Sequence, residues 1–503
     1  MHTSQPRCLI ALAGLLGLLA LGGCAVTRDD LTTADIDGMA LQAAQAEATL
    51  KEPLKGPIDL EEAMARALKL NADIRVQRFA AELAETRVRA GSMSMLPEAV
   101  AESHLYGRDT PAYSHSNMSP MNSTSSDVRS VTSDLTLSWS ILDFGLAYFR
   151  SQQEGDKAAK EREEVRHIAA RVLEETRSAY WRTLAFQRLG TRLVAIEPEV
   201  KAMLGASSQA IADQRVDPMV SLTYDRDMLG MRRELNDLLT TLAGSPQQLR
   251  QLIGVPQDVA LKLRQVRPAT TDRLVKRPIE DDVLLAFRSR FELRQALYDM
   301  RISDTEAYAA VAQALPGISF DVGMNRDSNS FLLNGSWLSW GSSVAWSLIK
   351  LARLPSDLDV VEAEKKLSRQ QTVALAASIA MQVRVARARV MVLRRTAEDA
   401  DTLADVQRRL LRQVDAAAEV GTVAPQMHTK EKLATLLAEV RADLAHADLE
   451  SAVGTYMATI GEDAVPDASI DGMSVSDIAA ALRQSGSGLR RSGTSSAEKV
   501  ASQ

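Results

Sequence analysis

The chain repeats its own pattern once, and this repeat is the strongest limit on the folds that it can adopt. The segment that starts at Ala67 aligns with the segment that starts at Ala286, at an offset of 219 residues (286 minus 67). Further along, Trp139 aligns with Trp346, and the offset has become 207 (346 minus 139). Because the offset changes only once, a single insertion or deletion separates two copies of a common plan. We therefore predict a tandem duplication.

The two halves of this duplication are residues 57–260 and 279–463, joined by an inter-repeat linker at 261–278. Each half is predicted to contain, in order, a helix, two strands, a very long helix and a returning helix. The first helix ends before Pro97 in one half and before Pro316 in the other, because proline cannot continue a helix.

Two stretches of helical pattern are much longer than the helices of ordinary globular domains. They cover about 146–215 and about 355–420, and a helix of that length extends about 100 Å at about 1.5 Å per residue. Apolar side chains from Ile379 to Leu393 are spaced 4, 3, 4 and 3 residues apart, which is typical of coiled coils. This spacing fits a closed bundle with a filled core and also a hollow ring, so the spacing alone leaves both interpretations open.

Short segments in which apolar and small polar residues alternate interrupt the helical pattern. We expect strands at about 98–107 and 132–142 in the first half, and at about 318–325 and 341–349 in the second. Such alternation over about ten residues is typical of a transmembrane β-barrel, with apolar side chains toward lipid and polar ones toward the lumen. The side chains predicted to face lipid are Leu135, Leu137, Trp139, Ile141, Ile318, Phe320, Val322, Val344, Trp346 and Leu348.

Aromatic residues gather in the same segments. The tryptophans expected in an interfacial aromatic belt are Trp139, Trp337, Trp340 and Trp346. The core of an ordinary β-sandwich also collects aromatic side chains and is the alternative. The uniformly small and polar opposite face of the strands favours the barrel.

Four strands from one chain cannot close a barrel. An open sheet edge in hydrocarbon leaves backbone N–H and C=O groups unpaired, so other copies of the chain must complete the sheet. Three copies would supply twelve strands around a water-filled interior and twelve helical columns around a hollow ring. The predicted fold is therefore mainly α with a transmembrane β-barrel: a trimeric twelve-strand β-barrel continued by a twelve-helix α-barrel.

The N-terminus has the features of a targeting segment. Arg7 precedes a short apolar run, and residues 1–23 are predicted to be a signal peptide. The run ends at Leu-Gly-Gly-Cys24, which resembles the lipobox of bacterial lipoproteins and implies a covalent lipid on Cys24. An ordinary signal peptide with an incidental cysteine is the alternative. Residues 24–56 are then a lipid-anchored linker, and residues 464–503 are expected to be a polar C-terminal tail.

Charge and motifs argue against several classes of function. Removal of the signal peptide leaves 58 basic residues (59 minus 1) and 65 acidic ones, a net charge of −7, which disfavours nucleic-acid binding. Cys24 would be the only mature cysteine, so no disulfide within the chain is possible. The six histidines lack metal-ligand spacing, and no phosphate-binding glycine loop or Gly-x-Ser-x-Gly motif is present. We expect no enzyme activity, no cofactor other than the lipid, and no metal.

Several of these features occur together in one known family. The tandem halves, the proline-terminated first helix, the stretch LSWSILDFG at 137–145 and the Gly421-Thr422 turn resemble the TolC family of outer-membrane channel proteins. The likeness covers about 57–463, and the lipobox makes the chain more similar to the lipoprotein branch found in tripartite efflux pumps. It implies a homotrimer whose α-barrel extends into the periplasm.

The resemblance also implies a function. The protein would be a passive exit duct in the cell outer membrane, joined to an inner-membrane transporter through a periplasmic adaptor, the membrane fusion protein. Two alternatives remain: the same channel serving type I protein or polysaccharide secretion, and a structural helical lipoprotein between envelope layers. The transported substrate and the type of pump are not encoded in any recognisable motif.

In the family, the adaptor contacts two turns at the periplasmic tip. The matching residues here are Gln214, Arg215, Val216, Asp217, Pro218, Gly421, Thr422, Val423, Ala424 and Pro425. Helix termination alone also explains the glycine and prolines. Met427 and Lys430 occupy the positions of the family's acidic constriction ring, so that ring is absent. The other candidates to line a narrowing are Asp225, Asp227, His428 and Lys430, with ordinary solvated charges as the alternative.

Overall fold

The computed structural model describes residues 30–49, 51–54, 56–116, 119–214, 217–264, 276–462 and 472–491. The chain divides into two compact units, Met1–Glu52 and Pro53–Gln503. In its described part the first unit contains helix α2 (Thr33–Thr49), which has no buried residue. The predicted linker at 24–56 did not include a helix. Four alanines in the second half of α2 give that segment a high helix propensity, which accounts for the difference.

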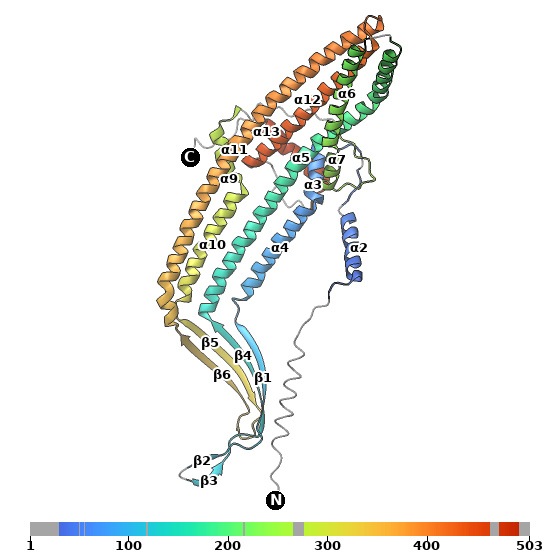
Figure 1. The fold of residues 1–503 in the computed structure, drawn as a ribbon. Helices are drawn as coiled ribbons and strands as arrows, with labels where there is room; N and C mark the ends of the chain where they lie inside the picture. The colour runs from blue at the N-terminus through green and yellow to red at the C-terminus, as the bar shows by residue number, and fades with distance from the viewer. Residues whose placement is uncertain are drawn as a thin grey trace. The chain divides into compact units, whose positions relative to one another are not determined.

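The second unit is mostly helical, and a similar order of helices occurs in each of its two halves (Figure 1). The first copy contains α3 (Leu60–Leu70), α4 (Ala72–Met93), α5 (Ile141–Ala212), α6 (Pro218–Leu242) and α7 (Ser245–Leu252). The second copy contains α9 (Ile279–Ser289), α10 (Phe291–Gln313), α11 (Leu348–Glu419) and α12 (Pro425–Ile460). When α5 is shifted by 207 residues its bounds become 348 and 419, which are those of α11. The duplication is thus visible in the fold.

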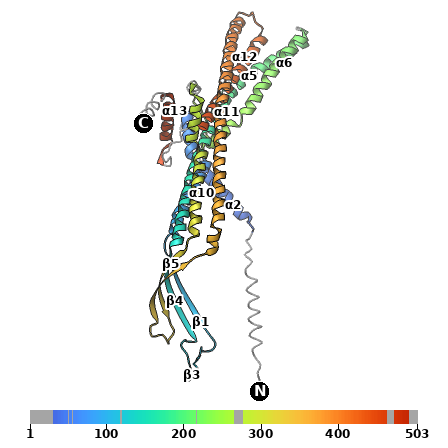
Figure 2. The ribbon, with the colours of Figure 1, turned by 90° about the vertical axis from the view of Figure 1, so that its left-hand side faces the viewer.

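Two strands from each half form one antiparallel sheet at one end of the long helices (Figure 1, Figure 2). The strands are β1 (Glu98–Gly107), β4 (Arg129–Ser140), β5 (Gly317–Asp327) and β6 (Ser336–Ala345), in the order β1-β4-β5-β6. β4 and β5 join the two halves, and β1 and β6 are the edges of the sheet. A small ribbon of β2 (Ser114–Ser116) and β3 (Ser119–Ser123) lies in the loop between β1 and β4.

The strands give way to the long helices earlier than predicted. The Ser140 side chain accepts a hydrogen bond from the Asp143 amide and caps α5, and Ser347 caps α11 through Lys350 in the same way. The prediction carried these strands on to residues 142 and 349 and began the last one at 341 instead of Ser336. Apolar residues continue through the first helical turn, so only the capping hydrogen bonds mark the boundaries.

The core of the second unit lies along the contacts between helices. α5 packs between α4 and α10, and its Leu173 and Tyr180 are buried in one cluster with Leu249 of α7. Ile379 and Val383 of α11 are buried in another cluster with residues of α12. These two residues belong to the predicted coiled-coil stripe. Among the helices that the structure describes, none has a segment both long and apolar enough to span a membrane.

The segment predicted to be a polar C-terminal tail contains a packed helix. α13 (Val475–Arg491) contacts α3 and buries Ile478, Ala479 and Leu482 against it. Arg483 also forms an ion pair with Asp59, at 2.8 Å. No helix was predicted here, because three apolar residues in a polar, Ser- and Gly-rich segment give little signal, although they are enough to dock one short helix on an existing core.

A buried charge network joins the second half to the linker that precedes it. The Asp282 carboxylate is 1% exposed and lies 3.2 Å from Arg277 and 3.3 Å from Arg387 of α11. The Tyr456 hydroxyl of α12 donates to the same carboxylate. Burial raises the pKa of Tyr456, so its hydroxyl stays protonated and remains a donor. The network therefore fixes α9, α11 and α12 against one another.

Removal of the central carboxylate should destabilise the protein strongly. We expect Asp282→Ala to lower the free energy of unfolding by about 3–5 kcal/mol, because two arginines would lose their buried partner. Thermal or denaturant unfolding of the purified protein measures this loss. The neighbouring Asp281 is exposed, and Asp281→Ala should change stability by no more than about 0.5 kcal/mol. Equal effects of the two substitutions would contradict the role of the network.

Candidate functional site

One face of the sheet carries large apolar side chains that are exposed in this chain. Leu137 lies opposite Val322, and Val322 lies opposite Trp340 on the next strand. Val322 is 46% exposed and Trp340 is 81% exposed, although both side chains are apolar. The pattern continues to Leu105 of β1, which is 76% exposed. An apolar surface that crosses four strands normally contacts lipid or another protein.

The opposite face of the sheet is mostly polar and carries several carboxylates. Ser319 and Ser343 hydrogen-bond across β5 and β6, with their hydroxyl oxygens 2.7 Å apart. The register places five carboxylates on this face, those of Glu98, Glu102, Asp134, Asp321 and Asp327. Within the four described strands no lysine or arginine shares it. Arg129 and Arg326 lie on the apolar face, near the loop end of the sheet.

The structure places the side chains predicted to face lipid in two groups. All ten are exposed in this chain. Seven lie on the apolar face of the sheet, whereas Ile141, Trp346 and Leu348 lie beyond the strand ends. Trp337, expected in the aromatic belt, lies on the polar face opposite Asn325, because β6 begins five residues earlier than predicted. Contact of the apolar face with lipid stays a prediction.

Two turns lie at the other end of the long helices (Figure 1). They have matching backbone geometry. Gln214 has φ 56° and its repeat equivalent Gly421 has φ 71°, so both turns use the left-handed conformation. Pro218 and Pro425 are the first residues of α6 and α12. Of the ten predicted tip residues, eight are described; Arg215 and Val216 lie outside the described residues, as does Cys24. Adaptor contact stays a prediction for all ten.

The four candidate constriction residues lie close to these turns, and each interacts with a partner in the same chain. Lys430 Nζ is 2.9 Å from an Asp227 oxygen, which links α12 to α6. His428 Nε2 is 2.6 Å from Asp415 Oδ1, which links α12 to α11. Asp225 accepts a hydrogen bond of 2.9 Å from a serine of α5. These side chains therefore hold neighbouring helices together near the turns.

The titration of two groups near the turns follows from these contacts. Hydrogen bonds from Lys430 and Arg226 lower the pKa of Asp227 below its ordinary value of 3.8. Burial, reinforced by the nearby carboxylates of Asp225 and Glu199, raises the pKa of Tyr224 to about 12. Asp227 is therefore charged and Tyr224 neutral throughout the physiological pH range.

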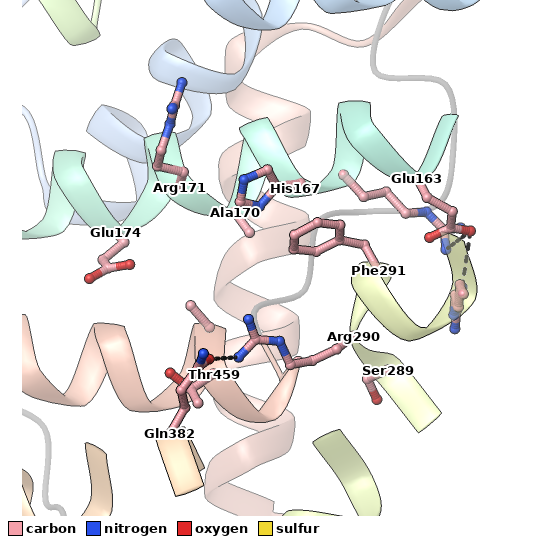
Figure 3. Close-up of a pocket in the computed structure, with 14 residues that line it drawn as sticks. Glu163, His167, Ala170, Arg171, Glu174, Ser289, Arg290, Phe291, Gln382 and Thr459 are labelled. Atoms are coloured by element: carbon pink, nitrogen blue, oxygen red, sulfur yellow. Dashed lines mark hydrogen bonds and ion pairs between the residues drawn. The ribbon is translucent and has the colours of Figure 1, made fainter. Parts of the chain in front are cut away.

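A cavity of 420 Å³ lies where α5 passes the junction of α9 and α10 (Figure 3). The His167 ring stacks on Phe291 with centroids 4.0 Å apart, and Arg290 donates to Gln382 at 2.8 Å. Glu163 is 3.4 Å from Arg294. The cavity is thus bounded by side chains that join the first half to the second, and Glu163, Arg290 and Arg294 among its charged groups have hydrogen-bond or ionic partners.

Comparison with known proteins gives one kind of match. No protein-family profile matches the sequence, and no curated protein sequence matches it either. The solved structure of the outer-membrane channel OprN matches with a TM-score of 0.62 at 13% identity, over 80% of this chain and 89% of OprN. The Campylobacter jejuni CmeC outer membrane channel gives 0.60 at 11% identity, over 85% and 89%. The Vibrio cholerae outer membrane protein VceC gives 0.59 at 12%, over 80% and 96%.

The chain has the TolC-family fold. At these identities the likeness concerns the fold alone, and it agrees with the family resemblance read from the order of the sequence motifs.

The sequence did not predict the partners of the charged residues near the turns. Lys430 and Asp227 are 203 residues apart in the chain, and no spacing rule relates them. Asp415 and His428 lie six and seven residues from Gly421, so the hairpin around that glycine was a usable signal for their pairing.

The ion pair between Lys430 of α12 and Asp227 of α6 should be detectable from the pKa of Asp227. A lowered pKa means that the Asp227 carboxylate contributes stability above its unfolded pKa, and this contribution is lost as the pH falls through the folded value. We expect Lys430→Met to raise the pKa of Asp227 toward 3.8. Carboxylate NMR of aspartate-labelled protein measures the change. Lys432→Met, which removes a partner of Glu199, is the control and should leave Asp227 unchanged.

Proposed function

We propose that this protein is the outer-membrane channel of a tripartite export system. It would conduct substrates passively from an inner-membrane transporter and a periplasmic adaptor to the cell exterior. The observation that carries the proposal is the sheet, which has an exposed apolar face, an acidic polar face and two edges with one strand neighbour each. A surface of this kind suits a barrel wall between lipid and water.

The proposal includes a homotrimer. Backbone groups at the edges of β1 and β6 need partners if the sheet lies in hydrocarbon, and only a closed barrel supplies them. Three copies of the sheet would give twelve strands, enough for a water-filled interior. The long helices would continue this wall into the periplasm, as the TolC-family fold implies. A lipid on Cys24 would anchor each copy to the outer membrane.

The proposed channel would be passive rather than catalytic. Its energy would come from the transporter, which the turns that precede Pro218 and Pro425 would reach through the adaptor. The OprN, CmeC and VceC structures support this role by their fold. A purely structural spacer between envelope layers would have no use for a polar, acidic strand face opposite an apolar one.

The test of the proposed function is conductance by a defined assembly. We expect the detergent-purified protein to have the mass of three chains and to open stable channels in planar lipid bilayers. Boiled protein is the control and should produce no channels. A monomer without conductance would exclude the channel and leave the structural spacer. Dye, metal and antibiotic sensitivity of a deletion strain, compared with its export of proteins, would then separate efflux from secretion.

Adjacent residues of β4 offer a matched test of the two faces. Leu137 lies on the apolar face, and we expect Leu137→Arg to abolish most of the assembled protein in the membrane, at a cost of about 2–4 kcal/mol per chain. Ser138 lies on the polar face between Glu98 and Asp321. Ser138→Arg should assemble normally and lower the preference of the channel for cations, because it adds positive charge among carboxylates. Reversal potentials in a salt gradient measure this preference, and equal effects of both substitutions would contradict the assignment of faces.

A further inference from the structure

Two arginines lie on the apolar face of the sheet, at its loop end. On β4 the apolar residue of this face nearest the loops is Val131, and Arg129 is the next side chain on the face. On β5 the corresponding residues are Met324 and Arg326. Within the four described strands, no carboxylate lies on this face. The two arginines therefore give one rim of an apolar surface a positive charge.

Both arginine side chains are exposed and have small neighbours. Arg326 lies opposite Ser133 on one neighbouring strand and opposite Ser336 on the other. Arg129 lies opposite Gly107, which has no side chain. Neither guanidinium forms an ion pair or a hydrogen bond with another described residue. Each charged group is therefore available to a ligand that approaches the apolar face from outside the chain.

The carboxylates closest in sequence to these arginines are held by other partners. Asp127 accepts hydrogen bonds from the Ser330 amide at 2.6 Å and from the Ser330 hydroxyl at 2.9 Å. Asp327, next to Arg326 in the chain, accepts a hydrogen bond from the Asn329 amide at 2.9 Å. These bonds hold the two loops together at the end of the sheet. They also direct the carboxylates away from the arginines.

The position of Arg129 matches the outer boundary of a lipid-facing band. Ten residues (139 minus 129) separate it from Trp139 on the same strand. At about 3.3 Å per residue and a strand tilt of about 40°, this separation corresponds to a height of about 25 Å. The apolar band of outer-membrane barrels is about as tall. With Trp139 at the inner boundary, Arg129 would lie at the outer one, and the long stem of Arg326 lets its guanidinium extend toward the same level.

We propose that Arg129 and Arg326 bind the phosphate groups of the glycolipid of the outer leaflet, lipid A. The proposal rests on the proposed function, because lipid contact requires the sheet to be part of a barrel in the outer membrane. An arginine on the lipid face is unfavourable below the headgroups, and a phosphate partner offsets this cost. Guanidinium and phosphate also form paired hydrogen bonds with matching geometry. The outer leaflet therefore supplies the charge that the apolar face lacks.

The spacing of the two arginines suits a headgroup with two phosphates. Arg326 lies opposite Ser133, which is four residues (133 minus 129) from Arg129 on β4. The two α-carbons are therefore separated by about 13 Å along the strands, at about 3.3 Å per residue. The disaccharide of lipid A carries a phosphate at each end, so one headgroup can contact both guanidiniums. A phospholipid with a single phosphate would satisfy one of them.

The loop after β5 adds apolar side chains to the same rim. Ser328 Oγ accepts a hydrogen bond from the Val131 amide at 2.7 Å, so the loop begins beside the strand that carries Arg129. Further along the loop, Phe331 is 51% exposed and Leu333 is fully exposed. Apolar residues beside cationic ones are typical of surfaces at the boundary between acyl chains and headgroups. The loop thus supplies apolar contacts next to the groups that bind phosphate.

Titration with defined lipids tests this site. Full-length protein in detergent is titrated with lipid A that carries both phosphates, and native mass spectrometry counts the bound lipid. We expect Arg129→Ser and Arg326→Ser each to weaken binding roughly tenfold, because each removes one charge-assisted contact. The double substitution should weaken binding roughly a hundredfold, since the two arginines contact separate phosphates. Dephosphorylated lipid A should bind the unchanged protein about as weakly as lipid A binds the double variant.

Two variants serve as controls. Arg129→Lys keeps the charge and should weaken binding less than Arg129→Ser, because a lysine ammonium still attracts phosphate. Arg233→Ser removes an exposed arginine of α6, outside the sheet, and should leave lipid binding unchanged. If a serine variant fails to assemble, the comparison of phosphorylated with dephosphorylated lipid A on the unchanged protein decides alone.

Conductance of the unchanged protein in planar bilayers, measured in parallel, separates the lipid site from the proposed channel. Channels combined with equal binding of the two forms of lipid A, or with binding that survives the double substitution, would overturn the lipid site and leave the channel intact. Phosphatidylglycerol that binds as tightly, with the same dependence on both arginines, would overturn the glycolipid as the occupant. Protein that neither assembles nor conducts would overturn the proposed function and the lipid site together.

Discussion

The hydrogen-bonding requirement of the two sheet edges governs the rest of this structure. β1 and β6 each have one strand neighbour in the chain, and the sheet between them exposes apolar side chains such as Trp340 on one face. In water the apolar face is unfavourable, and in hydrocarbon the open edges are unfavourable. Closure of several such sheets into a barrel removes both costs. The proposed channel follows from this requirement, since closure turns the acidic face into the lining of a water-filled space.

The helical part of the protein depends on contacts between charged side chains. Within the chain, the two halves are held by ion pairs such as Asp156 with Arg301, and by the buried carboxylate of Asp282. Such pairs need specific geometry and fix the halves in one register. An apolar surface can be exposed on a single chain before assembly, whereas a buried charge cannot be left without a partner.

Much of the architecture was predictable because the duplication displays each element twice. The strand alternation around Leu137 and Val322 gave the two faces of the sheet, since side chains alternate with a period of two. The positions at which strands end were harder, because Ile141 and Leu348 continue the apolar pattern into helices capped by Ser140 and Ser347. Trp337 lies on the polar face because β6 begins at Ser336, five residues earlier than predicted. α13 was missed because its few apolar residues matter only once α3 presents a surface to receive them.

The sequence by itself determined the duplicated order of helices and strands, the alternating faces of the sheet and the turns that contain Gly421 and Pro425. These features depend on residues that are close in the chain, through propensity, capping and periodicity. Only the tertiary structure decided that Lys430 meets Asp227, and that Asp282 lies among Arg277, Arg387 and Tyr456. Most of these contacts join residues far apart in sequence. They depend on the register in which long helices pack, which many weak side-chain contacts set together.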